Sequence, residues 1–140
     1  ATCELASPVA HDAHGAAFAD VDGDGRDEAL SFVTFHRTSR SSDGHEQRID
    51  EPWLVLFHGD ATDVSTRLVV APGVEVEGLR DQPDSVEEAR FAGSHVVATA
   101  RSGCYDCGCN TVELDFDCAA GPCRFVSQRV LVAVEDCESP

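Results

Sequence analysis

Short apolar runs separated by Gly, Pro and Asp recur along the chain, a spacing typical of β-strands joined by turns. The runs are rich in Val, Leu and Phe, and the side chain alternates between faces along a strand. We expect main strands at residues 29–35, 53–58, 66–70, 95–100, 111–118 and 125–134, with a short strand at 74–76.

Two of these runs predict strands that differ in how many of their faces are buried. The run "WLVLF" at 53–57 is continuously apolar, which predicts a central strand buried on both faces. The run "TVELDFDC" at 111–118 alternates, with apolar side chains at even positions and acidic ones at positions 113, 115 and 117. It therefore predicts a strand with one buried and one solvated face.

The segment "CAAGPC" predicts that the last two strands form a hairpin, because Gly-Pro favours a turn. If Cys118 faces Cys123 across the turn, Phe116 faces Phe125 in the next core-facing pair. Aromatic pairs of this kind stabilise antiparallel strands.

Two segments have patterns that predict a helix and a loop rather than strands. "DSVEEAR" at 84–90 has Ser85 and Glu88 at the spacing of a capping box and predicts one or two helical turns. The long polar segment 36–51 predicts an exposed loop, a natural place for partner recognition. The whole pattern indicates one all-β domain over residues 1–140, mostly an antiparallel meander that forms a sandwich or an open barrel-like sheet.

Composition adds a strong negative charge and a high cysteine content. The net charge of −16 disfavours nucleic acid and anionic membranes as partners. No run approaches the roughly 20 apolar residues of a membrane-spanning helix. Seven cysteines, the acidity and a chain that begins at Ala1 without Met together predict a secreted protein, extracellular, periplasmic or at the cell surface.

The acidic stretch "DVDGDGRDE" at 20–28 has the spacing of a calcium loop. Asp20, Asp22, Asp24 and Glu28 occupy positions 1, 3, 5 and 9, and Arg26 at position 7 would offer its backbone carbonyl. Calcium takes six to eight oxygen ligands from carboxylates and carbonyls. Position 12 is a serine rather than the glutamate of an EF-hand, and a strand-like run follows.

The stretch "FADVDGDGRDEAL" resembles the calcium loops of FG-GAP and VCBS-type repeats, which occur in integrin-like propellers. The later runs "WLVLFHGD" and "GSHVVATARSG" resemble the layout of small secreted bacterial proteins built on one such repeat. This resemblance implies calcium as the bound cofactor and no catalytic activity. We expect the ion to have a structural role, stabilising the fold by mass action.

The cysteines predict disulfides, although their connectivity does not follow from sequence. The candidate pairs are Cys3 with Cys137, Cys118 with Cys123, and Cys104 with either Cys109 or Cys107. One thiol is left over, either free or intermolecular, and it is Cys107 if Cys104 pairs with Cys109. The competing hypothesis is a zinc-binding module formed by the cysteines of the 104–123 cluster.

No nucleophile elbow, phosphate-binding loop or haem-attachment motif occurs, so we expect no enzymatic activity. The function predicted is a calcium-binding β domain with a structural or binding role, whose partner is an extracellular protein or a carbohydrate. An alternative is a self-associating subunit of an extracellular filament or surface assembly. It is based on the unpaired cysteine and on the continuous apolar strand, which could complete a neighbour's sheet. A small hydrolase with carboxylates around a metal is the third hypothesis.

Overall fold

The computed structural model describes residues 9–10, 16–59, 64–71, 74–79, 82–105 and 108–133. Within these ranges the chain contains only strands, turns and irregular segments, and every strand pair is antiparallel. No described segment is a helix long and apolar enough to cross a membrane.

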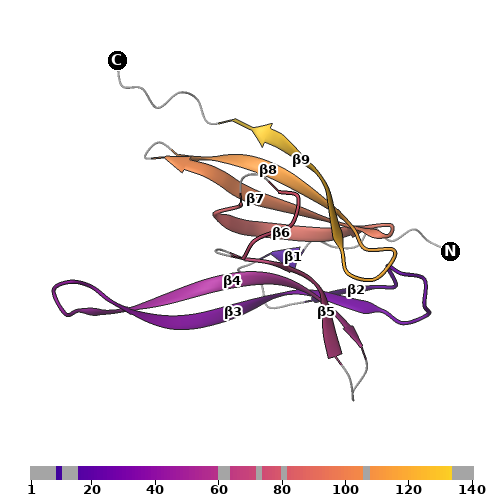
Figure 1. Ribbon diagram of the computed structural model, residues 1–140, viewed down its shortest axis with the longest axis horizontal. Coiled ribbons are helices and arrows are strands. Elements are labelled where there is room, and N and C mark those ends of the chain that lie inside the picture. The colour runs from indigo at the N-terminus through magenta and orange to yellow at the C-terminus, as the bar shows by residue number, and fades with distance from the viewer. Residues whose placement is uncertain are drawn as a thin grey trace.

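The strands form two sheets that lie as two layers (Figure 1). The first sheet has the order β2-β3-β4-β5 and contains β2 (Ala16–Ala19), β3 (Glu28–Arg40), β4 (Glu46–Gly59) and β5 (Val64–Val70). The second has the order β1-β6-β7-β8-β9 and contains β1 (Val9–Ala10), β6 (Ser85–Ala92), β7 (His95–Tyr105), β8 (Gly108–Asp117) and β9 (Arg124–Val132). Neither sheet closes into a barrel over the described strands, so the all-β, antiparallel prediction is confirmed in its sandwich form.

One hydrophobic core lies between the sheets. Leu30 and Leu54 from the first sheet join Val96, Leu114 and Phe116 from the second in a single buried cluster. Since both layers bury their inner faces in this cluster, packing between the sheets is the main source of stability.

The patterns predicted for β4 and β8 are confirmed. Leu54, Val55 and Leu56 are 0%, 5% and 0% exposed, so successive residues of β4 are buried on both faces. Along β8 buried and half-buried residues alternate, with Leu114 and Phe116 on the core side. The six main predicted strands fall on β3, β4, β5, β7, β8 and β9.

The segment 36–51 is not the predicted loop, although most of its described side chains are exposed as expected. Most of this segment belongs to β3 and β4, which pair as far as Arg40 and Glu46, and only residues 41–45 form the turn. In a two-stranded ribbon the inward-facing backbone groups pair across the strands and solvent can pair the outward-facing ones, so polar side chains do not prevent this structure. Figure 1 shows this hairpin reaching far beyond β2 and β5.

The predicted helix at 84–90 is also wrong, because the segment is the strand β6. The register skips Glu87 in a bulge between Val86 and Glu88. The bulge places the buried residues Val86 and Ala89 three positions apart, which imitates helical spacing in the sequence. Ser85 donates a hydrogen bond to the Glu87 carboxylate rather than capping a helix.

The predicted short strand at 74–76 is not a strand, because Val74 and Val76 lie in an irregular connection. The Val74 N–H donates to the Ala71 carbonyl as in a turn, and Gln82 hydrogen-bonds both backbone groups of Val76. The backbone groups of this segment therefore pair with neighbours in the connection rather than with a strand.

The β8–β9 hairpin has the predicted register. Phe116 pairs with Phe125, their ring centroids lie 5.9 Å apart in an edge-to-face arrangement, and a disulfide joins Cys118 to Cys123. This is the one disulfide described with both of its cysteines. Cys109 is also disulfide-bonded, and its partner lies outside the described side chains.

The remaining cysteine predictions concern residues beyond these ranges. Cys3, Cys107 and Cys137 lie outside the described residues, and only the backbone of Cys104 is described, within β7.

Candidate metal centre

The acidic loop spans residues 20–27 and connects β2 to β3 at one end of the first sheet. The pairing of Ala19 with Glu28 holds its two ends together. Gly23 and Gly25 have φ angles of 74° and 86°, a backbone region that residues with a Cβ rarely adopt. The loop can therefore turn twice within a few residues, which brings its alternate carboxylates to one side.

Asp20 organises the loop from inside the turn. Its carboxylate accepts backbone N–H groups from Gly23 at 2.9 Å, Asp24 at 3.2 Å and Gly25 at 2.9 Å. Desolvation raises the pKa of Asp20, but these hydrogen bonds and one with the Asp22 side chain outweigh it, so the pKa is lowered. The Asp20 carboxylate is therefore hydrogen-bonded to backbone N–H groups of the loop in this arrangement.

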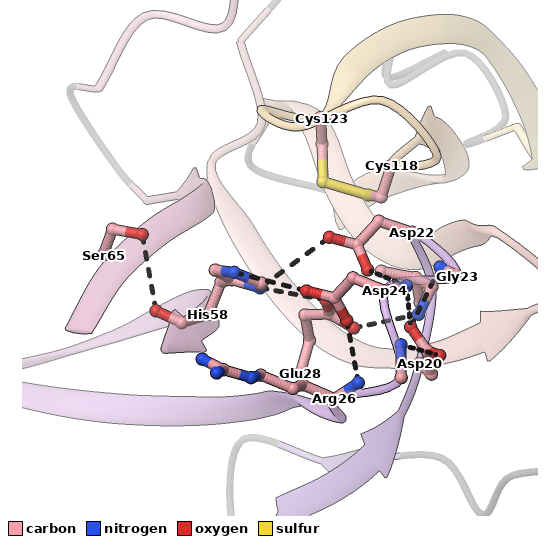
Figure 2. A network of polar contacts seen from close by, with 12 residues as sticks. Asp20, Asp22, Gly23, Asp24, Arg26, Glu28, His58, Ser65, Cys118 and Cys123 are labelled. Carbon is pink, nitrogen blue, oxygen red and sulfur yellow. Dashed lines mark hydrogen bonds and ion pairs between the residues drawn. A yellow bond between two sulfur atoms is a disulfide. The ribbon is translucent and has the colours of Figure 1, made fainter. Parts of the chain in front are cut away.

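Four side chains converge beside the loop, as Figure 2 shows: those of Asp22, Asp24, Glu28 and His58. Each offers one ligand atom, and these atoms all lie within 4.8 Å of one another. The Glu28 side chain is 1% exposed, whereas those of Asp22 and Asp24 are 14% and 35% exposed. The group thus runs from the core to the surface, with access from the Asp24 side.

His58 comes from β4 and faces all three carboxylates. Its Nδ1 lies 3.0 Å from Glu28 Oε1 and 3.8 Å from Asp22 Oδ2, and its Nε2 lies 3.6 Å from Asp24 Oδ2. The other Glu28 oxygen accepts the Val21 backbone N–H at 2.9 Å. Since Val21 is itself buried, the loop is fastened to the core directly beneath the cluster.

The structure brings together three of the five predicted ligand residues. Asp22, Asp24 and Glu28 belong to the cluster, whereas Asp20 accepts loop N–H groups. The backbone N–H of Arg26 donates to Asp24 Oδ1 at 2.8 Å, which orients one of the cluster carboxylates.

Sequence reasoning missed His58, which is 30 residues away from Glu28. The signal that could have found it is strand pairing. Ala29 pairs with Phe57. Glu28 precedes Ala29 and His58 follows Phe57, so both lie at the same end of the sheet.

The chemistry of this group suits a cation. Burying an ionised carboxylate such as that of Glu28 costs several kcal/mol unless an opposite charge or hydrogen bonds compensate it. Carboxylate oxygens suit hard cations such as Ca²⁺, and imidazole suits Zn²⁺ and other transition metals. The described cysteines Cys118 and Cys123 are joined in a disulfide and offer no thiolate for the alternative zinc module.

Comparison with known proteins gave no relative. No family model matches the chain, and neither the curated proteins nor the solved structures contain a match.

Proposed function

We propose that this chain is an extracellular, non-enzymatic calcium-binding β domain in which the ion and the disulfides stabilise the fold. The observation that carries the proposal is the convergence of Asp22, Asp24 and Glu28 with His58, with ligand atoms within 4.8 Å of one another. The resemblance of the loop to FG-GAP and VCBS-type calcium loops supports it.

Charge balance favours a divalent ion in this group. Within the cluster, three carboxylates face a single imidazole, so a protonated His58 would balance only one of the three negative charges. A divalent cation among these oxygens would remove their mutual repulsion. It would also link the β2–β3 loop to β4, two segments that the cluster already brings together, and so stabilise the folded state.

Isothermal titration calorimetry with calcium, on protein first treated with chelator, tests this proposal. We expect one site, and we expect Asp24→Asn to weaken it by at least tenfold because a ligand charge is lost. Asp27→Asn is the matched control, since Asp27 is an exposed acid of the same loop outside the cluster. Absence of calcium binding by the folded protein, or equal weakening by both substitutions, would contradict the proposal.

His58 favours a second candidate, a transition-metal site. Its two ring nitrogens lie 3.0 Å from Glu28 and 3.6 Å from Asp24, so an ion among these groups would be within reach of imidazole. Titration of His58→Gln with calcium and with zinc separates the candidates. Calcium binding that survives the substitution supports an oxygen-ligated calcium site, whereas zinc binding that His58→Gln abolishes supports the transition-metal site.

A further inference from the structure

A cleft of about 400 Å³ lies where β5, an edge strand of the first sheet, meets the β8–β9 hairpin of the second. Leu68, Val76, Phe116 and Phe125 supply its apolar wall, and the two phenylalanine rings meet edge to face. This volume is within the range of small-molecule sites, which are typically apolar with a few polar groups.

Covalent and hydrogen-bonded links fix the two walls of the cleft relative to each other. The Cys123 N–H donates to the Arg67 carbonyl at 2.7 Å, which ties the hairpin turn to β5, and the Cys118–Cys123 disulfide closes the turn. A Cβ at Gly121 would lie 3.2 Å from Arg67 Nη1, so the guanidinium rests against the turn at its one residue without a side chain. The cleft is therefore a preformed feature.

Among the described residues, Arg67 lines this cleft and has no partner for its charge. Its Nε is buried and has no hydrogen-bond acceptor, and no ion pair within 4.0 Å involves its guanidinium in the described part of the chain. By contrast, five other described arginines form an ion pair with a carboxylate, and Arg26 and Arg48 also have an interaction. The five are Arg40, Arg90, Arg101, Arg124 and Arg129.

The lack of an ion-pair partner for Arg67 is unexpected in a protein with 26 acidic and only ten basic residues. Acidic partners are abundant, and Glu75 and Glu77 line the same cleft, yet neither forms an ion pair with Arg67. A buried donor without an acceptor costs on the order of 1–3 kcal/mol, and more when the group is charged. An anion bound in the cleft would supply the counter-charge that the guanidinium lacks.

We propose that this cleft is a second binding site, which takes a small monocarboxylate with an apolar body. The guanidinium of Arg67 matches a carboxylate in shape and charge and can hold it through paired N–H donors. The apolar body would lie against Phe116 and Phe125. The exposed acids Glu75 and Glu77 on the cleft disfavour more highly charged anions, which is why a single negative charge fits best.

A matched pair of probes tests the proposal on the unaltered protein. 3-Phenylpropionate and its neutral amide have the same apolar body and differ in charge. In an NMR titration at constant calcium, we expect the carboxylate to shift the signals of Phe125 and Val76 and to bind at least tenfold more tightly than the amide. Equal affinities, or no shifts at these residues, would overturn the proposal.

Arg67→Met provides the second measurement, with Arg129→Met as control. Arg129 lies on β9, pairs with Glu113 and does not line the cleft. We expect Arg67→Met to reduce carboxylate affinity at least tenfold without changing amide affinity, and Arg129→Met to change neither. If Arg67→Met binds the carboxylate as the unaltered protein does, the proposal fails. If this variant does not fold, the comparison of the two probes decides.

Discussion

Glu28→Gln separates the charge of the buried carboxylate from its shape. The glutamine has nearly the same volume, and its carbonyl can still accept the Val21 N–H that Glu28 accepts at 2.9 Å. It loses the negative charge 3.0 Å from His58 Nδ1 and the oxygen that a bound cation would share. Any loss of calcium-dependent stability should therefore report on the loss of the charged ligand oxygen and not on a cavity.

The expected effect follows from mass action. At free calcium 100 times the dissociation constant, binding stabilises the folded state by about 2.7 kcal/mol. For a chain of 140 residues, 1 kcal/mol corresponds to about 4 °C, so the melting temperature should rise by about 10 °C. If loss of the ligand charge weakens binding about 100-fold, the stabilisation falls to about 0.4 kcal/mol and the rise to about 2 °C.

Thermal unfolding followed by circular dichroism, in calcium and in chelator, measures these shifts for the unaltered protein, Glu28→Gln and Asp27→Asn. Each variant in chelator serves as its own reference, so changes unrelated to the ion cancel. We expect Asp27→Asn to keep the full shift, because Asp27 is exposed and outside the cluster. The reasoning is refuted if Glu28→Gln keeps the full shift as well, or if the unaltered protein shows none.

Three further predictions concern the rest of the fold. The hydrogen bond with Asp115 raises the pKa of His95. This contact therefore stabilises the protein below the ordinary histidine pKa of 6.5, and its contribution is lost as pH rises through the raised pKa. NMR titration of His95 with and without Asp115→Asn measures the shift. Replacing Cys118 and Cys123 by alanine opens a loop with a sequence separation of 5 and should cost about 2 kcal/mol from chain entropy, measured by urea unfolding without reductant. Leu114→Ala, at a position that is 0% exposed, should cost about 2–5 kcal/mol in the same assay, and a loss below 1 kcal/mol would show that the site collapses around the smaller residue.

The sequence by itself determined the features that depend on neighbouring residues. Alternation predicted the buried and solvated faces of β8, and the Gly-Pro turn predicted the pairing of Phe116 with Phe125. The loop spacing identified Asp22, Asp24 and Glu28 as residues that meet. These features follow from side-chain direction along one strand or one turn, which the order of residues specifies directly.

Tertiary structure decided the features that depend on which strands lie side by side. The bulge at Glu87 in β6 arises from pairing with β7, and without that partner its spacing looked helical. His58 joins the acidic loop only because β4 pairs with β3, and Arg67 meets the β8–β9 turn only because the two sheets pack together. Contacts between residues far apart in the chain depend on strand pairing and sheet packing, and no local pattern encodes them.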